Sequence, residues 1–210
     1  MKIIGMLDSP YVRRAAISFQ LLGLPFEHLS LSVFRTYDQF RGFNPVVKAP
    51  SLICDDGTVL MDSTLIIDYA ESMPGKRRSL MPAALPQRQH ALHQIGLALA
   101  ACEKNVSIIY ERNLRPAEKL HQPWLDRLTA QLLAAYHLLE RDMAAQPLAE
   151  GSQQMNQAGV SVAVAWHFTQ QTLAELVPAA DFPALREFSS RAERLPEFIA
   201  APHGADTYRG

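Results

Sequence analysis

The spacing of hydrophobic residues changes several times within the first 80 residues. An apolar run from Lys2 to Leu7 is typical of a strand covered on both faces. From Pro10 onward apolar residues recur at helical spacing, and Gly23 stands where a helix favours a terminal glycine. The same reasoning predicts the remaining elements of this region: a strand over 26–31, a short helical or irregular stretch over 34–43, strands over 51–54 and 58–61, and a helix from Ser63 with Leu65, Ile66, Tyr69 and Ala70 on its apolar face.

The hairpin between the last two predicted strands has the strongest local signal. Asp55-Asp56-Gly57 separates two short apolar runs, and an Asp-Gly turn is favoured between antiparallel strands. The predicted order is therefore strand, helix, strand, short helix, hairpin and helix. This is the layout of a thioredoxin-like α/β domain, which we expect to occupy residues 1–78. Prolines and Gly75 then predict a linker over 79–85.

The second half has no strand-like alternation, and we expect residues 86–210 to form an all-α helical bundle. Helices are predicted over 87–113, from Pro123 to about Leu139, over 158–177 and over 181–194. The third is so apolar that it should be the buried central helix, with Trp166 in the core. Asn156 can cap it, although Gly159 cannot complete a capping box. Pro196 and Pro202 are expected to end the ordered part.

Composition argues against several classes of function. The net charge is −1, from 20 basic and 21 acidic residues, which gives no reason to expect nucleic acid or an anionic membrane as a partner. No apolar run reaches the roughly 18 residues of a membrane span, and the start lacks a signal-peptide pattern. The two cysteines, Cys54 and Cys102, do not form a Cys-x-x-Cys pair, so we expect a reducing, cytoplasmic location. The seven histidines form no ligand cluster, and no metal is expected.

Three short segments of the first domain could carry chemistry. Ser9 precedes Pro10 at the start of a helix, and Ser63 follows Asp62 at the start of another. Each serine is a natural helix cap, but a helix N-terminus also attracts anions. Ala49-Pro50 precedes a short strand, where a cis bond would turn the Ala49 N–H and C=O outward, although trans is the commoner isomer. Taken singly, each segment has an ordinary structural explanation.

Together, and in this order, the segments resemble the glutathione transferase superfamily over nearly the whole chain. The matching stretches are Ser9-Pro10-Tyr11 followed by Arg13, Asn44-Pro45-Val46-Val47-Lys48-Ala49-Pro50, Asp62-Ser63 followed by Ile66 and Tyr69, and Leu80-Met81-Pro82 in the linker. Tau-type members have serine where Ser9 stands, and omega-type members have cysteine. The chain resembles the bacterial members that carry Ser-Pro-Phe or Ser-Pro-Tyr.

The resemblance implies a glutathione transferase that conjugates the glutathione thiolate to a small electrophile, with glutathione as co-substrate and a homodimeric assembly. Ser9 would be catalytic and would hydrogen-bond the sulfur. The other glutathione-binding residues would be Lys48, Ala49, Pro50, Asp62 and Ser63. The electrophile pocket would include Tyr11, Tyr110 and Arg112.

Two departures from the family pattern stand out. Val47 replaces the usual glycine before the lysine, which puts the role of Lys48 in question. Asp8 is acidic at a place where some subclasses have the catalytic hydroxyl, so we expect it to point away from the site. The alternatives are a non-catalytic adaptor or regulatory protein, which should not bind glutathione, and a glutathione-dependent reductase or peroxidase. Reductase chemistry would need a cysteine where Ser9 stands.

Overall fold

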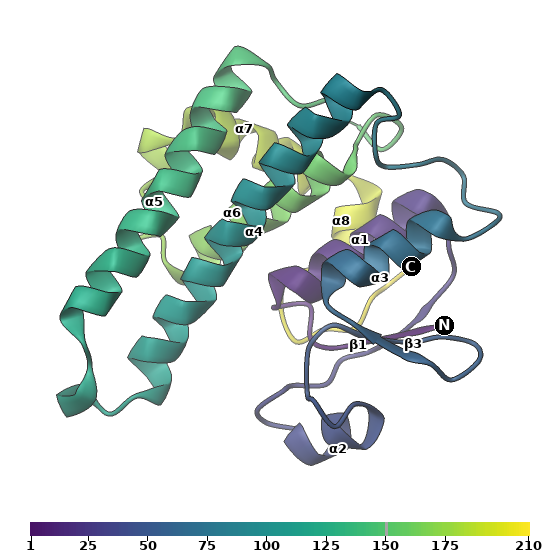
Figure 1. Cartoon of the computed structure of the whole chain (residues 1–210), viewed down its shortest axis with the longest axis horizontal. Helices are drawn as coiled ribbons and strands as arrows, with labels where there is room; N and C mark the ends of the chain where they lie inside the picture. The colour runs from purple at the N-terminus through teal and green to yellow at the C-terminus, as the bar shows by residue number, and fades with distance from the viewer. Residues whose placement is uncertain (150) are drawn as a thin grey trace. The chain divides into compact units, whose positions relative to one another are not determined.

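The computed structural model describes residues 1–149 and 151–210, which belong to two compact units (Figure 1). The sheet unit contains Met1–Met81, Gly151–Met155 and Glu193–Gly210, and the helical unit contains the described residues of 82–150 together with Asn156–Ala192. The sequence predicts one helical domain for everything after the 79–85 linker. In the structure, Gly151–Met155 and Glu193–Gly210 belong to the sheet unit instead.

The sheet unit is built on four strands in the order β2-β1-β3-β4. They are β1 (Lys2–Ile4), β2 (Glu27–Leu29), β3 (Ser51–Ile53) and β4 (Val59–Met61). β1 runs parallel to β2 and antiparallel to β3, and β3 and β4 form the antiparallel hairpin. The predicted α/β layout is thus confirmed.

Helices lie on both sides of this sheet. α1 (Pro10–Leu22) and α3 (Ser63–Ser72) pack against each other on one side, and Figure 1 shows α2 (Tyr37–Phe43) on the opposite side. A short helix from the far end of the chain, α8 (Pro196–Ala200), packs on α1. The N-terminal end of α1 therefore lies in an environment made by segments distant in sequence.

Two details of the predicted pattern are wrong. The first strand ends at Ile4, not Leu7, because Gly5 adopts a φ of +138° and turns the chain. The buried face of α3 includes Ile67, whereas the expected face residues Leu65 and Tyr69 are 62% and 37% exposed. The sequence spacing fits either stripe, and packing against α1 selects the one that begins at Ser63.

The expected end of the ordered part at Pro196 is also wrong. Pro196 is the first residue of α8, where its missing N–H costs nothing because that group has no partner in a helix. The chain then continues along the sheet unit, with the Arg209 N–H bonded to the Ala200 carbonyl at 2.8 Å. The ring of Tyr208 stacks on that of Phe26 with centroids 4.5 Å apart.

The helical unit confirms the predicted all-α second half. Its helices are α4 (Leu85–Leu114), α5 (Gln122–Ala145), α6 (Gln157–Thr172) and α7 (Pro183–Ala192), with short 3-10 turns at Ala117–Lys119 and Ala179–Asp181. α6 is the central helix and is buried along most of its length, and it packs against α4 and α7.

The start and the core of α6 follow the sequence expectations. The Asn156 side chain caps the helix by accepting the Gly159 N–H at 2.9 Å. Trp166 is only 3% exposed, and its ring meets those of Tyr136 and Phe182. It is therefore a core residue, as predicted. None of the helices in the described residues is both long enough and apolar enough to span a bilayer.

Candidate functional site

Ser9 lies at the junction between β1 and α1, directly before Pro10. Its N–H donates to the Met6 carbonyl at 3.2 Å, and its own carbonyl accepts the Arg13 N–H at 3.0 Å. A serine here usually caps the helix with its side chain, but in the described part of the chain the Ser9 side chain makes no cap hydrogen bond. The half-buried hydroxyl is therefore not engaged as a cap at a helix end that favours anions.

The loop before β3 is organised by the buried side chain of Asn44. Its Nδ2 donates to Ser51 Oγ at 2.8 Å, and its Oδ1 accepts the Val46 N–H at 3.0 Å. The Asn44 carbonyl accepts the Val47 N–H at 2.9 Å. This turn holds Val47 at a φ of 53°, the left-handed region that favours glycine. Val47, which replaces the glycine usual in the family, therefore lies at a position whose backbone conformation favours glycine.

Ala49 lies close to the start of α1. The Ala49–Pro50 bond is cis, the less common isomer considered from the sequence. A Cβ placed on Gly5 would lie 3.2 Å from Ala49 Cβ and 2.6 Å from Val12 Cγ2, so only glycine permits this approach. Among residues 1–149 and 151–210, no hydrogen-bond partner is found for the Ala49 N–H or carbonyl. Both groups are thus available to an extended, peptide-like ligand.

Ser63 does not cap α3, contrary to the sequence prediction. The N-cap is Asp62, whose φ of 70° lets its Oδ1 accept the Thr64 N–H at 2.8 Å. Ser63 is the first helical residue and only 1% exposed. Its Oγ accepts a hydrogen bond from Arg14 Nη1 at 3.0 Å.

Arg14 is a candidate site residue that the sequence analysis did not identify. It lies on α1, is 3% exposed, and donates to Thr64 Oγ1 at 3.2 Å as well as to Ser63. Because arginine only donates, Ser63 Oγ must accept, and the Ser63 hydroxyl hydrogen stays available for another acceptor. A buried positive charge and a helix N-terminus thus meet at one serine, which suits a carboxylate. The available signal was a charged pair, Arg13-Arg14, inside an otherwise apolar helix.

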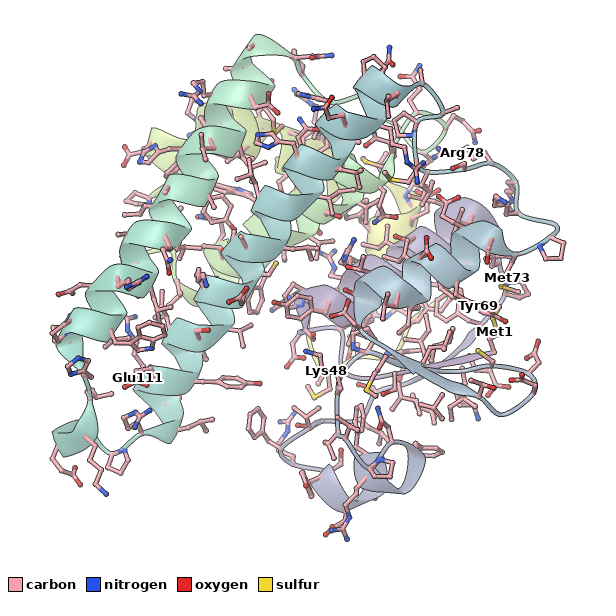
Figure 2. All side chains as sticks on the ribbon, in the orientation of Figure 1. Met1, Lys48, Tyr69, Met73, Arg78 and Glu111 are labelled. Carbon is pink, nitrogen blue, oxygen red and sulfur yellow. The ribbon has the colours of Figure 1, made fainter. Side chains whose placement is uncertain are left out.

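Helix α1 connects the three predicted segments. Ser9 begins it, Val12 on its first turn lies beside the Gly5–Ala49 contact, and Arg14 reaches the start of α3. Lys48, labelled in Figure 2, is exposed on the neighbouring loop, and it makes no ion pair with any described residue. Pro50 is buried behind Ala49.

Asp8 is exposed beside Ser9. Although the residue as a whole is exposed, its carboxyl group is partly desolvated, and this raises the pKa of Asp8 against the opposing effects of the Ser9 N–H and the Arg35 charge. Its expected orientation away from the site remains a prediction.

The residues predicted for a second-substrate pocket belong to different units. Tyr11 is half-buried on the first turn of α1 in the sheet unit. Tyr110 and Arg112 lie near the end of α4 in the helical unit, on either side in sequence of Glu111, which is labelled in Figure 2. Tyr110 is 42% exposed, and Arg112 pairs with Glu175 at 2.8 Å. Their role at a substrate remains a prediction.

No group of three or more His, Cys, Asp or Glu side chains suited to a metal ion occurs among the described residues. His90 instead lies 3.4 Å from Asp142.

Cys54 is buried, which raises the pKa of its thiol, and a hydrogen bond from Tyr69 lowers it by less. This cysteine has the properties of an inert core thiol.

Comparison with known proteins links this geometry to one family. Residues 3–78 match the family model described as the glutathione S-transferase N-terminal domain. The chain is 32% identical to the uncharacterized GST-like protein YibF of Escherichia coli over 87 residues, 41% of each chain. It is 26% identical to glutathione S-transferase U4 of Arabidopsis thaliana over 119 residues, 51% of this chain and 53% of that protein. The matches thus span about half or less of these relatives.

The fold comparison extends over nearly the whole chain. A glutathione transferase family member from Pseudomonas fluorescens Pf-5, with bound glutathione, superposes with a TM-score of 0.80 at 26% identity. The match covers 97% of this chain and 98% of that one. Both the sheet unit and the helical unit are therefore represented in the related structure.

Proposed function

We propose that the chain belongs to the glutathione S-transferase superfamily, binds glutathione and transfers the glutathione thiol to a small electrophile; the family-model match over residues 3–78 and the related fold support this. The observation that carries the proposal is that three binding features lie on or beside α1. They are the Ser9 hydroxyl that is not used as a cap, the unpaired Ala49 backbone groups beside Gly5, and the Arg14–Ser63 contact. Each feature suits a different part of one peptide-like anion.

The γ-glutamyl end of glutathione carries a carboxylate and an amino group. In this proposal the N-terminus of α3 receives the carboxylate, the Ser63 hydroxyl donates to it, and the buried Arg14 adds a positive charge. Asp62 uses one carboxylate oxygen for the cap and keeps the other for the amino group. Such charge-assisted hydrogen bonds are each worth about 1.5–3 kcal/mol.

The middle and the far end of glutathione need different partners. The cysteinyl unit is an amide on both sides, and it would pair with the N–H and C=O of Ala49 in strand fashion, above the buried Pro50. The glycyl end is a second carboxylate. Lys48, exposed on the same loop, would supply its counter-charge.

Ser9 would activate the sulfur. Lowering the thiol pKa from about 8.5 by roughly two units requires about 2.7 kcal/mol of thiolate stabilisation. A helix N-terminus supplies about 0.3–2 kcal/mol, and a hydrogen bond to a charged acceptor about 1.5–3. Toward the upper ends of these ranges, Ser9 and α1 together supply this stabilisation. The sulfur then forms a bond to the electrophilic carbon, and the electron pair leaves with the displaced group or takes up a proton after addition.

The identity of the electrophile is not implied by these residues. Tyr11, Tyr110 and Arg112 are proposed to line its pocket, and the chain is proposed to act as a homodimer in the cytoplasm. Turnover with glutathione across a panel of aryl halides, conjugated carbonyls and peroxides tests the activity. Calorimetric titration with glutathione separates binding from turnover.

The outcomes distinguish the competing functions. Glutathione-dependent consumption of an electrophile, reduced at least tenfold in Ser9→Ala, supports the transferase. Tight binding without turnover on any member of the panel would favour a regulatory protein, and absence of binding would favour an adaptor. Reduction of mixed disulfides would favour a reductase, although position 9 carries no thiol and Cys54 is 7% exposed.

A further inference from the structure

We infer that the C-terminal strap, defined as residues 193–210, positions Ser9 by contacting the residues on both sides of the turn from Gly5 to Ser9. The inference rests on the proposed function, because it concerns the geometry of the thiol-activating residue. The two residues through which the strap acts are Arg13 and His28. Neither is proposed to touch glutathione.

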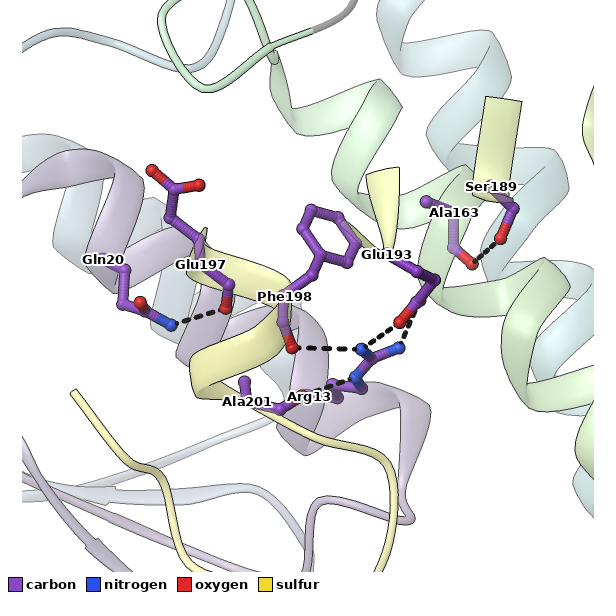
Figure 3. Close-up of polar contacts among 8 residues, drawn as sticks. All are labelled: Arg13, Gln20, Ala163, Ser189, Glu193, Glu197, Phe198 and Ala201. Atoms are coloured by element: carbon purple, nitrogen blue, oxygen red, sulfur yellow. Dashed lines mark hydrogen bonds and ion pairs between the residues drawn. The ribbon is translucent and has the colours of Figure 1, made fainter. Parts of the chain in front are cut away.

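Arg13 links the strap to α1, on the C-terminal side of Ser9. Its side chain is 2% exposed, and all of its hydrogen bonds with described residues go to the strap (Figure 3). Nη1 and Nη2 donate to the two carboxylate oxygens of Glu193, each at 2.6 Å, and Nε donates to the Ala201 carbonyl at 2.8 Å. The Arg13 N–H in turn bonds the Ser9 carbonyl at 3.0 Å. A bidentate pair restricts the arginine side chain strongly. Because the Arg13 N–H is bonded to the Ser9 carbonyl, restricting Arg13 also restricts the backbone of Ser9.

His28, on β2, links the strap to Gly5, which directly follows β1 on the N-terminal side of Ser9. Its Nε2 lies 2.7 Å from the Gly5 carbonyl, and its Nδ1 lies 3.0 Å from the backbone N of Tyr208 on the strap. A carbonyl needs a donor and an N–H needs an acceptor, so these partners define the neutral tautomer with its proton on Nε2. A protonated ring would direct a second N–H at Tyr208 and lose that contact.

The strap is docked beyond these two contacts as well. Ser30 Oγ donates to the Ala205 carbonyl at 2.7 Å, next to the stacked rings of Phe26 and Tyr208. It therefore follows the edge strand β2, while Gly5 pairs with the same strand through its N–H and the Leu29 carbonyl at 3.0 Å. The strap is thereby connected to both ends of the turn from Gly5 to Ser9, through Arg13 at one end and His28 at the other.

The charged and titratable groups near His28 come from the segments packed against it. They are the Lys2–Glu27 ion pair on β1 and β2, the Asp206–Arg209 pair and the Tyr208 phenol on the strap. Burial lowers the pKa of His28, and the hydrogen bond to Gly5 opposes this by less. The neutral form that the contact requires is thus the form that the surroundings favour.

Two matched pairs of variants test the inference in the full chain. Glu193→Gln weakens the grip on Arg13, and Gln20→Ala is its control. Gln20 also binds the strap, through the Glu197 carbonyl at 2.9 Å, but at the far end of α1 (Figure 3). Tyr208→Pro removes the N–H that His28 accepts, and Tyr208→Ala keeps this N–H while removing the ring.

Three measurements are made on each variant: the pKa of bound glutathione from thiolate absorbance, the glutathione Kd, and amide hydrogen exchange over residues 5–13. Glu193→Gln and Tyr208→Pro should raise the bound thiol pKa by roughly half a unit to one unit, a three- to tenfold loss of thiolate well below that pKa. The glutathione Kd should stay within about twofold, because Ala49 and Ser63 are untouched. Exchange over 5–13 should be faster than in both controls.

A strap that only stabilises the fold would lower the melting temperature in all four variants and leave the thiol pKa unchanged; that result overturns the inference. If the wild-type protein does not bind glutathione, the proposed function fails separately. Hydrogen exchange over residues 5–13 then decides alone. Equal exchange in Tyr208→Pro and Tyr208→Ala, and in Glu193→Gln and Gln20→Ala, would overturn the positioning role.

Discussion

Val47→Gly is a test of backbone strain next to the proposed glutathione site. Val47 has a φ of 53°, and it is a β-branched residue in a region where a Cβ crowds the following carbonyl. This conformation costs about 1–2 kcal/mol for a residue other than glycine. The turn persists because Asn44 fixes it with hydrogen bonds to Val46, Val47 and Ser51.

The neighbouring residue provides a matched control. Val46 is also a valine, is 65% exposed, and is not among the residues with positive φ. Glycine at either position makes the unfolded chain more flexible, at a cost of about 0.5–1 kcal/mol. Only Val47→Gly relieves strain in return. Allowing for the modest burial lost at Val47, we expect it to be more stable than Val46→Gly by about 1 kcal/mol.

Thermal unfolding of the two variants measures this difference. For a chain of this size, about 1 kcal/mol corresponds to roughly 2–4 °C in Tm. Glutathione affinity should be nearly the same as in the wild type, because glycine adopts the same φ and leaves Lys48 and Ala49 where they are. If Val47→Gly unfolds at the same temperature as Val46→Gly or below it, the strain argument is wrong.

The other predictions concern the site and the pH dependence of stability. Ser9→Ala should raise the bound thiol pKa by about one to two units with little change in glutathione affinity; superimposable thiolate titrations would make Ser9 a structural residue only. Ser63→Ala and Arg14→Met should each weaken glutathione binding about tenfold or more by calorimetry, and unchanged affinity in both would place the carboxylate elsewhere. Gly5→Ala should destabilise the fold by about 1–3 kcal/mol, because the new Cβ would lie 2.6 Å from Val12 Cγ2; chemical denaturation measures the loss, and wild-type stability would contradict the close approach. His28 has a folded-state pKa below its ordinary value of 6.5, so the unfolded state binds more protons in acid. Its contribution is complete above pH 6.5 and is lost as pH falls through the folded-state pKa, by at most about 1.4 kcal/mol per pH unit; His28→Gln should flatten this part of the stability profile, and an unchanged slope would refute the assignment.

Much of the architecture could be predicted from local sequence. The order of strands and helices in the first domain, the Asp55-Asp56-Gly57 hairpin, the Asn156 cap and the buried central helix all depend on interactions within a few residues. Periodicity and turn chemistry report such interactions directly. The serines proposed for the site were found in the same way, as residues at helix starts.

The roles of buried polar side chains were decided only by the tertiary structure. Arg13 and Arg14 are neighbours in one helix, and their hydrophobic context in the sequence does not indicate which partner either side chain has. Successive helical residues point about 100° apart, so Arg13 reaches Glu193, 180 residues away, while Arg14 reaches Ser63, 49 residues away. A periodic pattern indicates that a residue is buried without indicating its partner, because the partner comes from another part of the chain. For the same reason the strap, Ser63 as a hydrogen-bond acceptor and the buried face of α3 became known only once the fold had brought these segments together.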